Sequence, residues 1–532
     1  MGTPELISPN GVRQIVGLRR EALYDTATTR ELELQASANL PAHTLMARAG
    51  LAVARLARAI QPHARCIWVA CGPGNNGGDG LVAATHLHRW ALAGGSACHV
   101  VVTHAARRDD RVPVDAQWAM KAARDANVTF SDEPPADFDL AIDALLGIGP
   151  VRPLIGSMAQ WLVNMRTSSA PVLSVDLPSG LDADTGVRQP LGNESTGTPG
   201  PRHTLSLLTL KPGLFTGLGR DAAGEVWLDD LGISSAKFAR PSAWLSGQAC
   251  DNACGPATRP HSSHKGSYGD VIAIGGQGIG VDGAGMTGAA VLAARAALHA
   301  GAGRVFVGLL EGDTHNTVGW DPACPELMFR HINRLLEPNA LSNASVVCGC
   351  GGGAAVAAVL PAVLAHASAL VLDADALNAV ATDPTLQTLL SKRVGQGLST
   401  VLTPHPLEAA RLLGSTTAAV MADRVQAAQA IALRFGAVCV LKGSGTVLAA
   451  PGETPHINPS GNAALATAGT GDVLAGMIGG ALAGRRASPS KTAFERASEA
   501  VYQHGMLADR WTFDGSRSLT ASRLAARVMP LD

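Results

Sequence analysis

The chain has 532 residues, more than a single hydrophobic core accommodates, and this length predicts at least two domains. Hydrophobic residues make up 46% of the sequence and charged residues 16%, a balance that excludes an intrinsically disordered protein. The formal net charge of -1 excludes a protein that coats polyanions, so we expect neither nucleic acid nor a membrane surface as a partner.

Glycine and cysteine usage narrow the class of protein further. The 60 glycines exceed the usual share of about 7% and indicate backbone segments that approach ligands closely. The nine cysteines follow no repeated spacing, which favours reduced thiols. Pro4, Glu5 and Pro9 occupy the segment where a secretory leader would be apolar, so we expect a cytoplasmic protein.

The first half of the chain predicts alternating helices and strands. A mostly helical stretch, 30–60 with a break near Pro41, precedes short runs rich in valine and isoleucine. These runs are predicted as strands at 66–70, 99–103, 139–144, 172–176 and 204–210. Such strands separated by alanine- and leucine-rich helices are typical of a parallel sheet with crossover helices, so the first half is expected to be α/β.

The second half predicts another α/β unit after an irregular stretch at 232–260, which shows no sustained period and marks the domain boundary. A strand and a helix are predicted at 270–274 and 287–300. Further strands are predicted at 304–309, 345–348, 370–373, 400–403 and 438–442. No fixed-period repeat links the halves, which favours a fusion of two unrelated units over a duplication.

A glycine-rich segment, 71–80, follows the first predicted strand and precedes a predicted helix at 81–93. Free backbone N–H groups at such a helix start can hold a phosphate. A tight turn capped by Asp79 is the alternative interpretation of the glycines. Asn75, Asn76 and Asp79 favour a binding role, because amide and carboxylate oxygens suit a hard cation or a ribose.

Polar residues also stand at the ends of two later strands of the first half. Asp143 ends one strand, and Asp176 and Ser179 follow another. Each could be a simple cap or turn residue. Because carboxyl ends of parallel strands form the ligand crevice of an open α/β sheet, we expect these three residues and Asn76 to converge.

The second half carries its most specific motif at 469–472, Gly-Thr-Gly-Asp, which opens a predicted helix at 473–483. The helix start favours an anion, and Asp472 beside it is suited to take a proton from a hydroxyl as phosphate transfers to that hydroxyl. A capping aspartate is the alternative. Lys442 and His405 end two other predicted strands and are expected at the same crevice, as are Asp373, Asp375, Asn378 and Glu408.

The first half resembles the NAD(P)H-hydrate epimerase domain over roughly 20–235. The motifs that carry the resemblance are LPAHTLMARAG (40–50), GPGNNGGDG (72–80), DALLGIGPVRPL (143–154), SVDLPSGLDADTG (174–186) and TLSLLTLKPGL (204–214). Ile148 and Pro150 depart from the usual threonine and leucine. The resemblance implies a Rossmann-like domain at 1–235, followed by a linker at 236–258.

The same resemblance implies roles for individual residues. Contacts to the hydrated dinucleotide transfer to Asn75, Asn76, Gly77, Gly78, Asp79, Gly147, Ile148, Gly149, Pro150, Val151, Arg152, Pro153 and Asp176. Ligands of a potassium ion transfer to Asn76, Asp143 and Ser179. The reaction breaks and re-forms a C–O bond at the hydroxyl-bearing ring carbon. We expect Asp176 to shuttle the proton of the departing oxygen, a role worth roughly 10²–10⁴-fold in rate.

The second half is similar to the ribokinase-like ADP/ATP-dependent NAD(P)H-hydrate dehydratases, from about 261 to 511. The motifs are HKGSYGD (264–270), GAAVLAARAAL (288–298), TPHPLE (403–408), VLKGSGT (440–446) and GTGD (469–472). Cys350 stands where proline is usual, and Leu407 where glycine is usual. The resemblance implies a ribokinase-like domain at 259–532 that phosphorylates the ring hydroxyl from ADP and then eliminates phosphate.

The residues that this second resemblance assigns fall into two groups. Nucleotide contacts transfer to Lys442, Gly443, Ser444, Gly445, Thr446 and Gly471. Contacts to the hydrated dinucleotide transfer to Ala289, Gly351, His405 and Asp472, with Asp472 catalytic.

The two resemblances together predict a bifunctional enzyme that interconverts the R and S hydrates of NADH or NADPH and dehydrates the S form. We expect ADP as co-substrate, K⁺ in the first domain, Mg²⁺ with the polyphosphate, and a homo-oligomer. The alternatives are a kinase for a vitamin precursor or sugar in the second half, since the ribokinase-like frame is shared, and a non-catalytic binding module in the first half.

Overall fold

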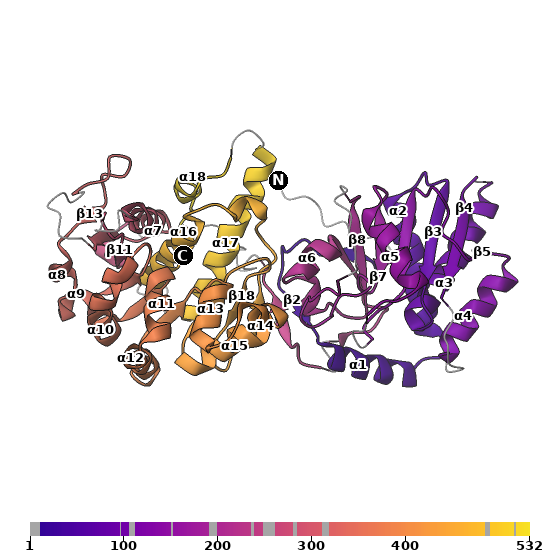
Figure 1. Ribbon diagram of the computed structural model, residues 1–532, viewed down its shortest axis with the longest axis horizontal. Helices are drawn as coiled ribbons and strands as arrows, with labels where there is room; N and C mark the ends of the chain where they lie inside the picture. Colours follow the sequence, from indigo (N-terminus) through magenta and orange to yellow (C-terminus); the bar gives the residue numbers. More distant parts are fainter. Residues whose placement is uncertain are drawn as a thin grey trace. The chain divides into compact units, whose positions relative to one another are not determined.

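A computed structural model describes most of the chain. The described residues are 11–95, 97–105, 112–149, 153–190, 199–235, 239–247, 261–279, 285–310, 319–484, 490–514 and 518–531. They form two compact units, Met1–Ala243 and Trp244–Asp532 (Figure 1). The limits expected for the domains and for the linker at 236–258 stay a prediction, and much of that linker lies outside the described residues.

The first unit contains a largely parallel sheet with helices between its strands. The strands of this sheet are β1 (Arg13–Gln14), β3 (Cys66–Cys71), β4 (His99–His104), β5 (Thr129–Ser131), β6 (Leu140–Ala144), β7 (Val172–Val175), β8 (Arg202–Leu207) and β9 (Glu225–Asp229). The short strand β2 (Glu21–Leu23) is not part of it. The helices are α1 (Thr26–Ala38), α2 (Thr44–Ile60), α3 (Asn75–Ala93), α4 (Val114–Asp125), α5 (Ser157–Thr167) and α6 (Leu218–Ala223). The sheet order is β1-β9-β8-β7-β6-β3-β4-β5.

This strand order reverses at β3. The chain runs outward from β3 through β4 to β5, then returns to β6 on the other side. Such a reversal leaves a crevice beyond the carboxyl ends of β3 and β6, the usual ligand position in an open α/β sheet. Asn76 follows β3 and Asp143 lies in β6, so the reversal brings both to this crevice.

The second unit contains a second twisted sheet. Its strands are β10 (Ala243–Leu245), β11 (Asp270–Gly275), β12 (Arg304–Leu309), β13 (Met328–Phe329), β14 (Ala344–Cys348), β15 (Ala369–Leu372), β16 (Ser399–Leu402), β17 (Val438–Leu441), β18 (Val447–Ala449) and β19 (His456–Ile457). They lie in the order β13-β12-β11-β14-β15-β16-β17-β18-β19-β10. The order reverses between β11 and β14, which predicts a second crevice there.

Helices cover this second sheet. They are α7 (Thr287–His299), α8 (Ile332–Leu335), α9 (Pro338–Ser342), α10 (Val356–His366), α11 (Ala374–Thr382), α12 (Pro384–Gly395), α13 (Pro406–Leu413), α14 (Thr417–Ala422), α15 (Arg424–Phe435), α16 (Thr470–Ala483), α17 (Ala493–Asp514) and α18 (Ala521–Ala526). Glycines bring α16 close to α7, because a Cβ on Gly476 would lie 2.0 Å from the Ala293 carbonyl oxygen. This packing fixes the position of the helix that carries Asp472.

The expected fold class is confirmed, with differences at particular elements. Parallel sheets were expected, but the two sheets also contain antiparallel pairs, each of which includes a strand that the sequence did not predict: β1 with β9, β17 with β18 and β18 with β19. Helix α3 begins at Asn75 and not at 81, so Gly77, Gly78 and Gly80 of the motif are helical residues. A Cβ on Gly77 would lie 1.9 Å from the Gly72 carbonyl oxygen. Helix α16 likewise begins at Thr470, which places Asp472 in its first turn.

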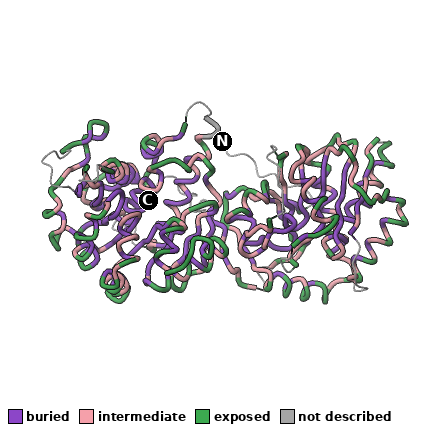
Figure 2. Tube along the Cα trace, in the orientation of Figure 1, coloured by how far each residue is buried: buried purple, intermediate pink, exposed green. Residues whose placement is uncertain are grey.

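Each unit has its own apolar interior. The core clusters of the first unit lie on β3, β6 and the helices beside them, and that of the second unit on β11, β14, α7 and α16. Figure 2 shows the buried positions gathered along the strands inside each unit. Among the described residues, no helix combines the length and apolar character needed to span a membrane.

Candidate active sites

A cavity of about 910 Å³ opens at the strand reversal of the first unit. Asn75, Asn76, Asp79 and Asp176 line it, together with the loop at 145–149. A volume in this range suits a ligand of dinucleotide size. Predicted residues from three separate motifs therefore share one cavity, although the predicted contacts Gly77 and Gly78 do not line it.

Asp176 is held by a buried lysine. Lys211 Nζ donates to the Asp176 carboxylate, and to the Leu207 carbonyl oxygen at 2.8 Å; the lysine is completely buried. The Leu207 N–H also donates to Asp176 Oδ1 at 3.2 Å. The Asp176 backbone has a φ of 67°, in the left-handed region that non-glycine residues rarely adopt. These bonds fix an unusual backbone conformation, as is common at functional sites.

Asp143 and Ser179 form a second, fully buried cluster behind the cavity. Ser179 donates to the two carboxylate oxygens of Asp143, through its hydroxyl at 2.6 Å and its N–H at 2.9 Å. The Ser179 Oγ accepts from the Leu146 N–H at 2.9 Å. Burial raises the pKa of Asp143, although these hydrogen bonds and the charge of Arg166 oppose the rise. The cluster therefore anchors the loop that begins at Leu145.

That loop brings Asn76 and Asp176 together. A Cβ on Gly147 would lie 3.1 Å from Asn76 Oδ1 and 3.3 Å from Asp176 Oδ2, so glycine leaves room for both side chains. Arg30 Nη2, on α1, donates to the Ile148 carbonyl oxygen at 2.8 Å. Gly149 and Pro153 line the same cavity. The predicted contacts at Pro150, Val151 and Arg152 lie outside the described residues.

Two further carboxyl groups face this cavity. Burial, with the charges of Asp176, Glu33 and Asp115, raises the pKa of Asp79 well above its usual range. The pKa of Glu33 is also raised, mainly by burial and next by the charge of Asp176, whereas the charge of Lys211 lowers it. The cavity thus holds a carboxylate paired with an ammonium beside carboxyl groups that retain their protons more readily, an arrangement suited to acid–base chemistry.

The residues expected to hold a potassium ion have the donor atoms that a hard cation prefers. Asn76, Asp143 and Ser179 offer amide, carboxylate and hydroxyl oxygens. Within the described chain, the Asn76 Nδ2 is buried without a hydrogen-bond partner. Because the two ends of an amide are assigned from their partners, a reversed amide would place an oxygen at that position. The donor set therefore fits a cation.

In the second unit, Asp373 and Lys442 form a buried ion pair at the ends of β15 and β17. Lys442 Nζ donates to Asp373 Oδ1 at 2.6 Å, and the Thr403 hydroxyl donates to the same oxygen at 2.8 Å. Burial lowers the pKa of Lys442, but Asp373 and Glu408 outweigh burial and leave it above its ordinary value. Lys442 therefore keeps a positive charge inside the crevice.

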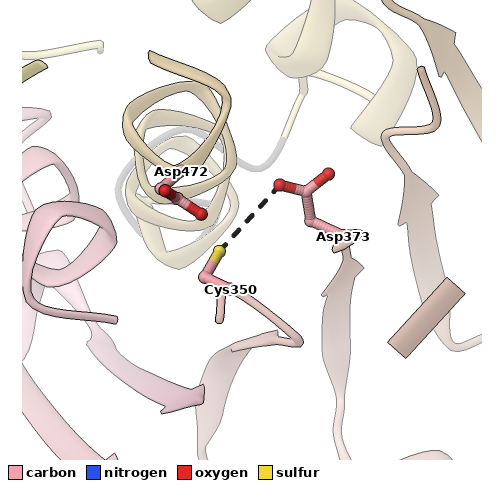
Figure 3. Close-up of side chains that lie close together, drawn as sticks. All are labelled: Cys350, Asp373 and Asp472. Carbon is pink, nitrogen blue, oxygen red and sulfur yellow. Dashed lines mark hydrogen bonds between the residues drawn. The ribbon is translucent and has the colours of Figure 1, made fainter. Parts of the chain in front are cut away.

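Asp472 lies beside this pair, and Cys350 lies between the two aspartates. Figure 3 shows Asp472 on its helix, Asp373 after its strand and Cys350 on the loop that approaches both. One ligand atom from each of the three residues lies within 4.8 Å of the others. Burial and the Asp373 charge raise the pKa of Asp472 to about 6. A cation here would compete with the Lys442 ammonium for Asp373, and we assign none to this cluster.

His405 begins α13 at the same edge of the sheet. Its Nδ1 accepts from the Leu407 N–H at 3.1 Å, and the Glu408 carboxylate accepts from the His405 N–H at 2.8 Å. Burial and the Lys442 charge lower the pKa of His405, and burial raises that of Glu408 to about 7. A neutral His405 can therefore accept or donate a hydrogen bond toward a ligand.

The segment Lys442–Thr446 forms a glycine loop above a buried arginine. The Arg424 Nη2 donates to the carbonyl oxygens of Leu441, Lys442 and Gly445 at 3.2–3.4 Å. A Cβ on Gly443, whose φ is 139°, would lie 2.9 Å from Arg424 Nη1. A Cβ on Gly471 would lie 3.4 Å from Lys442 Nζ, so this loop and the start of α16 meet. The Lys442 ammonium and the first turn of α16 therefore meet there, as an anion site requires.

The remaining predicted contacts also lie at the second crevice. A Cβ on Gly351, whose φ is 59°, would lie 2.9 Å from the Ala289 Cβ. The Gln277 N–H donates to the Gly351 carbonyl oxygen at 2.7 Å, which joins the loop after β11 to the loop after β14. Ala289 and Gly351 therefore lie together where the strand order reverses.

Several side chains at these sites carried no specific signal in the sequence. Lys211, Glu33 and Arg30 belong to no expected site, and Arg424 lies on an ordinary amphipathic helix. Lys211 lies in the motif at 204–214 that carries the first resemblance, but no role was assigned to it there. Asp373 and Glu408 were expected at the crevice without a role.

Two family models match the chain. The model described as YjeF-related protein N-terminus matches residues 42–213, and that described as NAD(P)H-hydrate dehydratase matches 279–530. The bifunctional NAD(P)H-hydrate repair enzyme Nnr of Escherichia coli (strain K12) is 36% identical over 493 residues, 88% of this chain and 85% of the relative. The relative from Leishmania braziliensis is 32% identical over 95% of this chain and 92% of its own length.

Single-domain proteins match the second unit. The ADP-dependent (S)-NAD(P)H-hydrate dehydratase of Neisseria meningitidis serogroup B is 40% identical over 51% of this chain and 86% of the relative. The solved structure of an ADP/ATP-dependent NAD(P)H-hydrate dehydratase from Bacillus subtilis, crystallised with ATP and Mg²⁺, is 29% identical. It covers 50% of this chain and 90% of that chain, with a TM-score of 0.38.

Proposed function

This chain belongs to the family of bifunctional NAD(P)H-hydrate repair enzymes, and from that membership we propose which residues perform its two reactions. The enzyme epimerises the R and S hydrates of NADH and NADPH and dehydrates the S hydrate. The observation that carries the residue assignment is the gathering of the predicted motifs at the two strand reversals.

We propose that the first cavity epimerises the hydrate by removing and restoring its ring hydroxyl. Asp79, which retains its proton, donates it to the departing hydroxyl; the C–O bond breaks, and the ring nitrogen supplies electrons to form an iminium cation. The Asp176 carboxylate, paired with Lys211, stabilises this cation and takes a proton from the water that adds to the other face. This differs from the expectation that Asp176 alone shuttles the proton, because its salt bridge suits a proton acceptor.

Asp176→Asn and Asp79→Asn test this assignment in the full chain. Each is expected to reduce epimerisation by at least 10²-fold while dinucleotide binding remains measurable, because an amide replaces neither the acid nor the base. Interconversion of the R and S hydrates is followed by chromatography, and dehydration by the second unit is the internal control. Full epimerisation by Asp176→Asn rejects the assignment.

We propose that the second crevice dehydrates the S hydrate with ADP. Lys442, Gly443, Ser444, Gly445, Thr446 and Gly471 would hold the polyphosphate. Asp472 accepts the proton of the ring hydroxyl as its oxygen attacks the β-phosphorus and AMP leaves. The new phosphate ester then eliminates phosphate while C5 loses a proton, which restores the reduced nicotinamide ring. Ala289, Gly351 and His405 would position that ring.

Asp472→Asn tests the second assignment. With ADP and the S hydrate, the unchanged enzyme regains the absorbance of the reduced nicotinamide and releases AMP and phosphate in equal amounts. Asp472→Asn is expected to lose at least 10²-fold of this rate, while epimerisation by the first unit stays unchanged. Accumulation of a stable phosphorylated hydrate by the unchanged enzyme would contradict the elimination step.

The proposal includes the ions, the assembly and the location expected from the sequence. Asn76, Asp143 and Ser179 would hold K⁺, which supplies a positive charge beside the substrate when bound. Mg²⁺ would accompany the polyphosphate. We also propose that the enzyme is a homo-oligomer and lies in the cytoplasm, where reduced nicotinamide nucleotides and ADP are both present.

A further inference from the structure

We propose that Asp115, positioned by His43, binds the 2′-hydroxyl of the adenosine ribose and gives the first cavity a preference for NADH hydrate over NADPH hydrate. This inference rests on the proposed function of that cavity and names which of its two substrates the cavity favours. His43 belongs to the motif at 40–50, to which no role was assigned, and Asp115 belongs to none of the motifs.

The two side chains form a short hydrogen bond between the starts of two helices. His43 Nδ1 lies 2.5 Å from Asp115 Oδ1, and because a carboxylate only accepts, the ring nitrogen is the donor. The same imidazole stacks on Trp118, with ring centroids 4.8 Å apart and planes 4° from parallel. Asp115 and Trp118 lie one turn apart on α4, so one imidazole contacts both. These two contacts hold the Asp115 carboxylate in place.

The backbone of His43 indicates that this contact is more than a helix cap. His43 directly precedes α2, where a side chain commonly caps the helix, yet it makes no capping hydrogen bond. Its φ is 65°, in the left-handed region that non-glycine residues rarely adopt. Such a conformation persists where surrounding contacts impose it and is common at functional sites.

The second carboxylate oxygen of Asp115 is open to a ligand. Asp115 lines the first cavity, and no donor among the described residues bonds to its Oδ2. The Asp115 side chain is 42% exposed, against 11% for Asp176, so it lies nearer the opening than the proposed reaction centre. A dinucleotide whose nicotinamide ring lies at Asp176 extends its adenosine away from that centre. A carboxylate that accepts from a ribose hydroxyl is a common feature of dinucleotide sites.

Charge favours a hydroxyl over a phosphate at this position. NADPH hydrate carries a 2′-phosphate in place of the hydroxyl, and this group offers no donor to the Asp115 carboxylate and is repelled by it. The cationic side chains that line the cavity are Arg30 and Lys211. Each already bonds within the chain, Arg30 to the Ile148 carbonyl oxygen and Lys211 to the Asp176 carboxylate. The first cavity therefore suits the ribose of NADH hydrate better.

A second cavity of the first unit is the alternative position for a 2′-phosphate. It measures about 460 Å³ and is lined by four titratable side chains, His104, Lys121, Arg124 and Asp125, among others. Pro73 lines both cavities, so the two adjoin. Lys121 already pairs with Asp125 there. A phosphate bound in this second cavity would reverse the preference toward NADPH hydrate, which makes the two positions distinguishable.

Epimerisation of both hydrates by the full chain tests the proposal. We measure kcat/KM separately for NADH hydrate and NADPH hydrate and compare their ratio. The unchanged enzyme should favour NADH hydrate by about 10-fold or more, as expected for a hydrogen bond to a charged group. Asp115→Ala should bring the ratio near 1, mainly by raising KM for NADH hydrate. The charge of Asp115 also raises the pKa of Asp79, but the same ring reacts in both substrates, so this effect cancels in the ratio.

Variants of His43 test its positioning role. Glycine adopts a φ of 65° without strain, so His43→Gly removes the side chain alone, and the ratio should fall several-fold. His43→Asn, which tolerates the same backbone conformation and keeps a donor, should retain more of the preference. Combining His43→Gly with Asp115→Ala should give the ratio of Asp115→Ala alone, because His43 acts through Asp115.

Asp125→Ala is the matched control. Asp125 lies on the same helix and lines the second cavity but not the first, so its ratio should equal that of the unchanged enzyme. If Asp115→Ala loses its thermal transition, Asp115→Asn takes its place, and its ratio should again fall. A preference of the unchanged enzyme for NADPH hydrate, an unmoved ratio in the folded Asp115 variant, or a shifted ratio in Asp125→Ala overturns the proposal.

Failure of the proposed function gives a different result. If the unchanged enzyme does not interconvert the hydrates of either dinucleotide, or if Asp176→Asn keeps the full rate, the assignment of the first cavity fails. If epimerisation proceeds with equal kcat/KM for both dinucleotides, that assignment stands and the inference about Asp115 is wrong.

Discussion

At the scale of single residues, both crevices pair an aspartate with a lysine, which is fully buried at Lys211 and partly buried at Lys442. Lys211 contacts Asp176 in the first unit, and Lys442 contacts Asp373 in the second. A buried ion pair adds little net stability, but removing one partner leaves an uncompensated charge and is costly. In the first unit the pair holds the Asp176 carboxylate in place, and in the second unit the pair lies beside Asp472.

Replacement of Lys211 tests this at the first site. Lys211→Met should lower the free energy of unfolding of the first unit by about 3–5 kcal/mol, because it leaves Asp176 buried and unpaired. The rate of epimerisation should fall together with the stability of the first unit, while dehydration by the second unit continues. Thermal denaturation and the two activity assays measure these effects.

Lys121→Met is the control for Lys211→Met. Lys121 also pairs with an aspartate, Asp125, at 2.8 Å, but both side chains are exposed. Exposed pairs contribute little to stability, so no measurable change is expected. A Lys211→Met enzyme as stable and active as this control would contradict the role given to Lys211.

At the scale of elements, helix α16 carries residues proposed for the anion site and the proposed proton acceptor. Its first turn contains Gly471 and Asp472, and Gly476 and Gly480 lie against α7. A Cβ on Gly480 would lie 2.7 Å from the Ala297 carbonyl oxygen. Glycine is unfavourable inside a helix, so its presence at these positions reflects the close approach of two backbones.

Gly476→Ala tests this packing. The added Cβ would lie 2.0 Å from the Ala293 carbonyl oxygen, so α16 must move, at a cost of about 1–3 kcal/mol. Dehydration should fall because Asp472 and Gly471 move with the helix. Gly288→Ala, in α7, is the control: nothing lies within 4 Å of its added Cβ, and stability should stay equal or rise. Equal stability of the two variants would contradict the packing argument.

At the scale of the whole molecule, we expect each reaction to be confined to one unit. The division falls between Ala243 and Trp244, and each core cluster of the described residues lies on one side of it. A unit of this size can bury enough apolar surface to fold alone. Each proposed site is assembled from residues of one unit, so we expect the two activities to be separable.

Separate expression of the units tests this independence. A cut after Pro241 keeps β10 with β19, whose strands pair through Trp244 and His456. The first fragment should retain epimerisation, and the second should retain dehydration of the S hydrate, each within a few-fold of the full chain. A mixture of both hydrates should be consumed completely only when both fragments are present. Loss of either activity in a folded fragment would contradict this division of labour.

The sequence by itself determined the α/β class and the strands that end in functional residues, because buried parallel strands are continuous apolar runs and motif spacing is local. It also located Asp176, Asp472 and the glycine loops. Only the tertiary structure decided that Lys211 pairs with Asp176, that Cys350 lies beside Asp373 and Asp472, and that Arg424 bonds to the glycine loop Lys442–Thr446. Those contacts join residues far apart in the chain, and their distances depend on how loops and helices pack across a strand reversal, which no local pattern encodes.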